Sequence, residues 1–142
     1  MRVLAVDFGE KRIGLAVSSP SGEIVLPVGA VARTSDAQAA SAVAAAARER
    51  EVERIVVGLP VRSEGDGESP FAARARGFAR KLGEASGLPV ELHGEALTSA
   101  SADGTLREAG VRGHRRAAAL DAEAAAELLR DWLASRRNGS AG

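Results

Sequence analysis

The chain has 142 residues, the usual size of one domain, and its 45% hydrophobic content is typical of a globular fold with a buried core. Aromatic residues make up only 3% and cysteine is absent, which excludes an aromatic platform for single-stranded nucleic acid, disulfides and thiolate metal sites. The 19 basic and 19 acidic residues cancel, so a nucleic-acid partner would require a local basic patch or metal ions that offset the acids.

The first third of the chain predicts three strands and a helix. The strands cover residues 3–8, 13–17 and 24–32. The first is a continuous apolar run that ends at Gly9, as expected of a strand buried on both faces. Short connections favour antiparallel pairing of these strands. Ser35 and Asp36 can then cap an alanine-rich helix that runs to about Arg50.

Strands and helices alternate in the rest of the chain. We expect a strand at 55–58, a loop at 60–69, a helix at 70–86, a strand at 88–92 and helices at 99–109 and 120–135. This order predicts an α/β fold, a mixed five-stranded sheet with helices on both faces.

We expect one domain over residues 1–135 and a flexible tail over 136–142. No apolar run approaches the roughly 20 residues of a membrane span, and the expected location is the cytoplasm.

Asp7 is an acid at the end of an otherwise apolar strand. Val3 and Ala5 share its face of the strand under the two-residue period. A carboxylate buried alone among such neighbours would cost free energy, whereas at the strand's end it can face a crevice. Asp7 is therefore a candidate functional residue.

Two more acids lie where a core pattern would predict other residues. Asp121 shares one helical stripe with Ala125, Leu128 and Trp132, although an aspartate in a first helical turn can also serve as a cap. Glu95 follows the last predicted strand, where a solvated loop glutamate is the simpler interpretation when it is considered alone.

Considered together, the acids predict a metal site. Parallel strands bring their carboxyl ends to one edge of a sheet, where ligands tend to bind. Carboxylate oxygens without cysteine make a hard site that selects Mg²⁺ or Mn²⁺ over Zn²⁺. Such ions can activate a water molecule and stabilise the leaving oxygen in phosphodiester cleavage.

Four segments in order resemble the YqgF/RuvX family, described as Holliday-junction resolvases and as pre-16S ribosomal RNA nucleases. The segments read VDFGEKRIGLAVS, VVGLPVRSEGDGESPFAARARGFARKL, LHGEALT and LDAEAAAELL. They resemble the family's DxGxxxxGxA opening, its GLP segment with the following helix, its DERLT-type motif and its terminal Asp-x-x-Ala-Ala helix. The resemblance extends from Met1 to about Leu133 and implies a ribonuclease-H-like fold.

The resemblance implies that the family's catalytic acidic triad falls on Asp7, Glu95 and Asp121, which would hold Mg²⁺ or Mn²⁺ for nuclease chemistry. One segment departs from the family pattern. The usual Asp-Glu-Arg triplet stands here as Gly94-Glu95-Ala96, which keeps the ligand candidate Glu95 and removes one charge of each sign.

Basic and polar side chains near these segments are candidates for binding nucleic acid, because arginine suits bidentate contact with phosphate. The candidates are Lys11, Arg12, Arg74, Arg76, Thr98, Arg112, Arg115 and Arg116. Each charged member could equally be a solvated surface charge, which is the preferred interpretation of Arg76.

The leading hypothesis is a metal-dependent endonuclease that cuts either Holliday junctions or the 5′ end of precursor 16S ribosomal RNA. Resolving a two-fold symmetric junction needs two active sites, which a homodimer would supply. The alternatives are a catalytically weak nucleic-acid-binding domain and, ranked lower, an actin-like ATP-binding protein. A DxG turn followed by a hairpin also resembles the phosphate-binding turn of the actin-like proteins.

Overall fold

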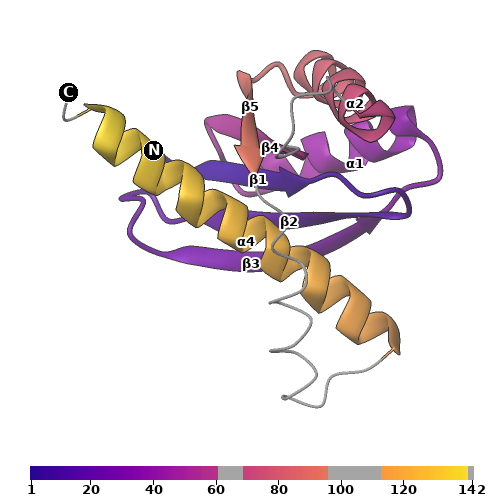
Figure 1. The fold of residues 1–142 in the computed structure, drawn as a ribbon, viewed down its shortest axis with the longest axis horizontal. Coiled ribbons are helices and arrows are strands. Elements are labelled where there is room, and N and C mark those ends of the chain that lie inside the picture. Colours follow the sequence, from indigo (N-terminus) through magenta and orange to yellow (C-terminus); the bar gives the residue numbers. More distant parts are fainter. Residues whose placement is uncertain (61–68, 96–112, 141–142) are drawn as a thin grey trace.

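The computed structural model describes residues 1–60, 69–95 and 113–140 (Figure 1). The strands are β1 (Val3–Asp7), β2 (Arg12–Ser18), β3 (Val25–Ala32), β4 (Arg54–Pro60) and β5 (Val90–Glu95). The helices of the described part are α1 (Asp36–Glu49), α2 (Pro70–Ser86) and α4 (Gly113–Ser140). The predicted helix at 99–109 and most of the predicted loop at 60–69 lie outside the described residues.

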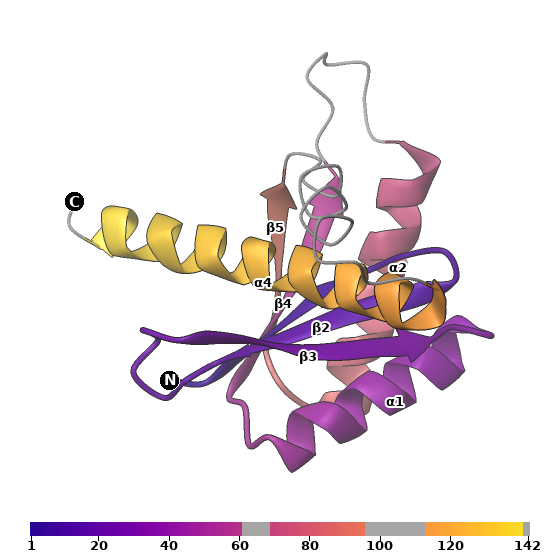
Figure 2. The same cartoon turned by 90° about the horizontal axis from the view of Figure 1, so that it is seen from below.

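The strands form one mixed sheet in the order β3-β2-β1-β4-β5. β1 and β3 run antiparallel to β2, whereas β1, β4 and β5 are parallel neighbours. Helices α1 and α2 cover one face of the sheet and α4 crosses the other (Figures 1 and 2). The predicted α/β class, with a mixed five-stranded sheet and helices on both faces, is confirmed.

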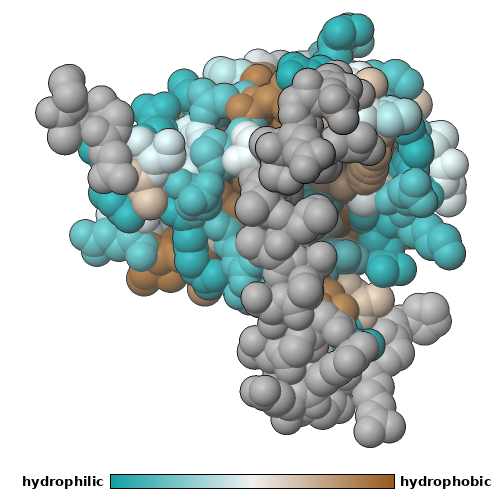
Figure 3. Space-filling model, viewed as in Figure 1, coloured by the Kyte–Doolittle hydropathy of each residue, from teal (hydrophilic) through white to brown (hydrophobic). Residues whose placement is uncertain are grey.

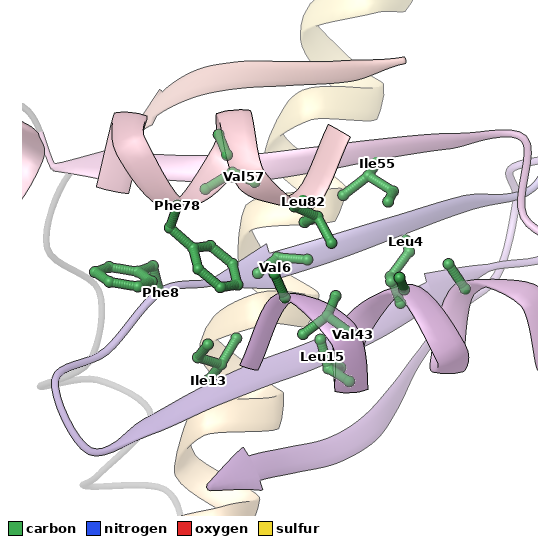
Figure 4. Close-up of a cluster of buried hydrophobic side chains, with 14 of the residues drawn as sticks. Leu4, Val6, Phe8, Ile13, Leu15, Val43, Ile55, Val57, Phe78 and Leu82 are labelled. Carbon is green, nitrogen blue, oxygen red and sulfur yellow. The ribbon is translucent and has the colours of Figure 1, made fainter. Parts of the chain in front are cut away.

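The larger core lies between the sheet and the helices α1 and α2 (Figure 4). Leu4 and Val6 of β1 point into it, together with Phe78 and Leu82 of α2, and all four side chains are fully buried. The alanine-rich sequence of α1 suits this position, because small side chains let the helix lie close to the sheet and to α2. These contacts bury one apolar side of α2.

A second core lies between the sheet and α4. Val3 and Ala5 of β1 pack there against Ala125, Leu128 and Trp132, which are the apolar members of the predicted α4 stripe. All five side chains are at most 2% exposed. Alternate residues of β1 therefore face opposite helices, as the apolar run predicted, and Asp7 continues the row that faces α4.

Helix α4 is longer than the sequence predicted at both ends. It begins at Gly113 instead of Leu120 and continues to Ser140, so the expected flexible tail is helical as far as residue 140. The added residues include arginine and alanine, which have high helix propensity. Arg137 in the last turn also complements the negative end of the helix dipole.

Ser18 supplies a buried polar contact that ties β2 to the start of β1. Its side chain is 1% exposed, and its Oγ accepts a 2.9 Å hydrogen bond from the backbone N–H of Val3. We expect Ser18→Ala to lower the free energy of unfolding by about 1–3 kcal/mol, because a buried N–H loses its acceptor. Urea denaturation measures this change.

The matched control for this variant is Ser41→Ala, at an exposed position inside α1. Alanine raises helix propensity there, so the control should be neutral or slightly stabilising. Equal unfolding midpoints for the Ser18 variant and wild type would contradict the assigned contact.

The described surface is mainly hydrophilic on the face shown in Figure 3, with hydrophobic side chains visible in small areas. The large apolar side chains that are about half exposed are Met1, Ile24 and Leu26. Among the described residues, no helix combines the length and apolar character needed to cross a membrane.

Candidate functional site

The first candidate acid, Asp7, is the last residue of β1 and is partly buried on the α4 side of the sheet. The chain turns immediately afterwards into β2. A Cβ atom on Gly9 would lie 2.3 Å from the carbonyl oxygen of Arg12, so this turn can close only around a glycine. The turn thus ends β1 at the acid and places Lys11 and Arg12 a few residues from it.

Gly14 of β2 is the Cα partner of Asp7 in the antiparallel pair, and it lies directly under α4. A Cβ atom on Gly14 would be 1.9 Å from the carbonyl oxygen of Asp121 and 2.4 Å from its carbonyl carbon. Because real Cβ atoms do not approach other atoms this closely, only glycine permits the α4 backbone to rest on the strand here. The close approach brings Asp121 to the strand position beside Asp7.

Asp121 lies well inside α4, on the stripe that faces the sheet. It lies about two helical turns after Gly113, where α4 begins, so it is neither a cap nor a first-turn residue. The interpretation of Asp121 as a helix cap is therefore wrong. Its side chain is 24% exposed, and its Oδ2 accepts a 2.7 Å hydrogen bond from Nε of Arg12. The carboxylate of Asp121 is therefore held by a cation at the partly open end of the stripe.

The third acid, Glu95, is the last residue of β5, and its backbone is paired with Pro60 of β4. The sequence predicts it just beyond the strand. β5 is displaced toward the C-terminus because β4 continues to Pro60 and offers backbone partners as far as residue 95. The carboxyl ends of β1, β4 and β5 share one sheet edge, as parallel pairing requires. The side chain of Glu95 lies outside the described part of the structure.

His93 lies near this edge and is not among the predicted site residues. Val6 pairs with Val57, and Gly58 pairs with His93, so Asp7 and His93 flank Gly58 across the parallel strands. Nε2 of His93 lies 2.7 Å from Oδ2 of Asp131 on α4. No side chain from Gly58 separates the two positions.

The signal that could have found His93 is the two-residue period of β5. Trp132 of α4 donates a hydrogen bond to Glu91, which places residues 91 and 93 on the face toward α4. The partner Asp131 could not be identified in advance, because its contact depends on how α4 crosses the sheet.

Two of the predicted nucleic-acid-binding residues lie in or beside the β1–β2 turn, and a third lies close by. Lys11 is exposed, and Arg12 begins β2. Nη1 of Arg74 on α2 lies 3.9 Å from Oε1 of Glu10, so the N-terminal part of α2 approaches the same turn. The structure thus gathers Lys11, Arg12 and Arg74 at the end of the molecule that carries Asp7.

The remaining candidates are dispersed or lie outside the described side chains. Arg76 is exposed on α2, and Arg116 is partly buried on α4. Arg115 belongs to α4, but its side chain is not among those described. Thr98 and Arg112 lie outside the described residues.

The site's chemistry fits a hard divalent cation. Asp7 and Asp121 offer carboxylate oxygens, the donors that Mg²⁺ and Mn²⁺ prefer, and Asp121 already attracts the guanidinium of Arg12. Among the side chains that the structure describes, no group of three acidic, histidine or cysteine residues is close enough to hold a metal ion. A complete triad would need Glu95 as its third member.

In comparisons with known proteins, almost the whole chain matches one family. Residues 1–135 match the family described as "RuvX: Holliday junction resolvase". A relative from Anaeromyxobacter sp. (strain K), named "Putative pre-16S rRNA nuclease", is 46% identical over 136 residues, which are 96% of this chain and 98% of that protein. A relative of the same name from Mycobacteroides abscessus is 42% identical over 146 residues, covering 99% of this chain and 86% of its own.

Solved structures with low sequence identity share the fold. RuvC from Thermus thermophilus has a TM-score of 0.58 at 17% identity, with 97% of both chains covered. The fowlpox virus resolvase in complex with Holliday junction DNA has a TM-score of 0.54 at 10% identity, with 95% of this chain and 98% of that chain covered. The predicted ribonuclease-H-like fold is confirmed by its similarity to RuvC.

Proposed function

The chain belongs to the RuvX family of Holliday junction resolvases, and we propose that it is a divalent-metal-dependent endonuclease acting on structured nucleic acid. The observation that carries the proposal is the contact of the Asp121 backbone with Gly14, the strand partner of Asp7. It brings together acids that are more than a hundred residues apart, at the sheet edge where ligands of such folds tend to bind.

Asp7, Asp121 and Glu95 are the residues proposed to hold Mg²⁺ or Mn²⁺. When bound, the ion supplies a more acidic water molecule and offsets charge on the leaving oxygen. The chain's own cations would orient the nucleic acid: Lys11 is exposed in the turn beside Asp7, and Arg74 approaches the same turn from α2. Phosphate contacts of this kind fix the position of the nucleic-acid backbone and do not distinguish one base sequence from another.

The substrate that we favour is the 5′ end of precursor 16S ribosomal RNA, because the two relatives described above are named as pre-16S rRNA nucleases. The second candidate is the Holliday junction, which is favoured by the family description. Cutting a junction symmetrically would need a homodimer, whereas cutting an RNA end would not. Both substrates would place the protein in the cytoplasm.

A catalytically weak nucleic-acid-binding domain is the alternative, and one specific observation favours it. The triplet Gly94-Glu95-Ala96 lacks the acid and the arginine that flank the glutamate in the family pattern. Fewer charges at the edge of the sheet would leave the metal and the phosphate less firmly held. The family description names a resolvase, which supports nuclease chemistry over the ATP-binding alternative.

Metal removal tests the proposal. We expect the protein to cut precursor 16S RNA in Mn²⁺ or Mg²⁺ and to lose all cleavage in EDTA, because the ion would supply both the more acidic water molecule and the charge that offsets the leaving oxygen. Gel analysis of end-labelled RNA, with a four-way DNA junction assayed in parallel, measures this and ranks the two substrates. Cleavage that persists in EDTA would contradict metal dependence, and binding without cleavage in both metals would favour the alternative.

A further inference from the structure

We propose that Arg12 exchanges partners during the reaction cycle. In the metal-free chain it holds Asp121, and when a divalent ion binds it leaves that carboxylate for a phosphate of the substrate. Arg12 is thus a positioning residue that links metal binding to nucleic-acid binding. This inference rests on the proposed function and goes beyond it by assigning a regulation of the same site.

The starting contact is an ion pair at the mouth of the site. Nε of Arg12 lies 2.7 Å from Oδ2 of Asp121. The contact follows from the strand, because residues 12 and 14 of β2 share a face under the two-residue period and Gly14 supports the backbone of Asp121. The guanidinium is therefore positioned by the close approach that also places the carboxylate.

A divalent ion and this guanidinium compete for the same carboxylate. Both are cations, so Arg12 raises the cost of bringing a metal ion to Asp121 while it offsets the carboxylate's charge in the absence of metal. The pair is easily broken, because the Arg12 side chain is 43% exposed and the Asp121 side chain 24% exposed, and exposed ion pairs stabilise a fold only slightly. Direct coordination of a divalent ion can therefore displace the arginine.

The released guanidinium lies where a phosphate is expected. Arg12 follows Lys11 in the exposed turn, and Arg74 approaches that turn through Glu10. A planar guanidinium can make two parallel hydrogen bonds to one phosphate, which suits it better to the substrate than to one carboxylate oxygen. Coupling between two ligands is reciprocal, so phosphate binding should in turn free Asp121 for metal.

The first measurement is Mn²⁺ binding by isothermal titration without nucleic acid. We expect Arg12→Gln to bind Mn²⁺ about three- to fivefold more tightly than wild type, the upper part of the range for losing a competing exposed ion pair. Arg80→Gln is the control that removes the same charge from an exposed residue of α2, on the other side of the sheet from α4, and we expect it to change the affinity by less than about twofold, as for screened surface charges.

The second measurement is nucleic-acid affinity in Ca²⁺ and in EDTA, with a precursor 16S RNA fragment and a four-way DNA junction as probes. In Ca²⁺ we expect Arg12→Gln to bind the preferred probe about tenfold more weakly than wild type, because a charged phosphate contact is lost. In EDTA we expect this difference to fall to about two- to threefold, because Arg12 must first leave its ion pair with Asp121. Arg12→Met replaces the glutamine variant if thermal unfolding shows that the latter is destabilised.

Each outcome bears on the exchange. Tighter Mn²⁺ binding combined with a loss of nucleic-acid affinity that is larger in Ca²⁺ than in EDTA supports it, and a loss of equal size in both overturns it. Equal Mn²⁺ affinities for wild type and Arg12→Gln, or equal gains for the Arg80 and Arg12 variants, overturn it while leaving metal-dependent cleavage by wild type intact. A wild-type protein that binds no Mn²⁺ overturns both the exchange and the proposed metal site.

Discussion

Gly14→Ala is expected to lower the free energy of unfolding by about 3 kcal/mol, at the upper end of the cost of overpacking a core. The new methyl group would lie 1.9 Å from the backbone carbonyl oxygen of Asp121. A backbone atom cannot rotate away as the end of a side chain can, so α4 or β2 must move. Urea denaturation measures the loss.

The same variant should also weaken Mn²⁺ binding, because a displaced α4 moves Asp121 away from Asp7. Gly77→Ala is the matched control, since nothing lies within 4 Å of a Cβ atom at that α2 position. We expect this control to stabilise the protein by roughly 0.5–1 kcal/mol, the ordinary gain for glycine to alanine within a helix. Unchanged stability in the Gly14 variant would show that α4 does not rest on β2 at this point.

Asp7→Asn is expected to lower the cleavage rate by about a thousandfold or more, because metal-assisted hydrolysis contributes several kcal/mol and each 1.36 kcal/mol is tenfold in rate. The amide keeps the size of the side chain and removes the negative charge that would hold the ion. Cleavage of the preferred substrate under single-turnover conditions measures the effect. Weaker Mn²⁺ binding by the same variant would link the loss of rate to the metal.

The control for Asp7→Asn is Glu84→Gln, which neutralises an exposed acid on α2, away from the α4 face. We expect the control to cut at the wild-type rate, and both variants to retain the wild-type circular dichroism spectrum. A folded Asp7→Asn protein that cuts as fast as wild type would remove Asp7 from the catalytic site and would contradict the proposed mechanism.

Local patterns in the sequence determined most of the fold. The apolar run of β1, with Asp7 at its end, predicted a strand buried on both faces, and the two cores confirm it. The apolar stripe of Ala125, Leu128 and Trp132 likewise predicted which side of α4 packs against the sheet. Burial repeats every two residues in a strand and about every 3.6 in a helix, so these features are visible within short segments.

Only the tertiary structure decided how the distant segments meet. The contact of Asp121 with Gly14, its ion pair with Arg12 and the pairing of His93 with Asp131 depend on the path of α4 across the sheet. The sequence identified Asp7 and Asp121 as candidates. It could not show that α4 packs directly on β2 beside Asp7 because Gly14 has no side chain. Arg12 and Asp121 are 109 residues apart, and no short-range pattern carries the geometry of a contact formed when separate elements pack together.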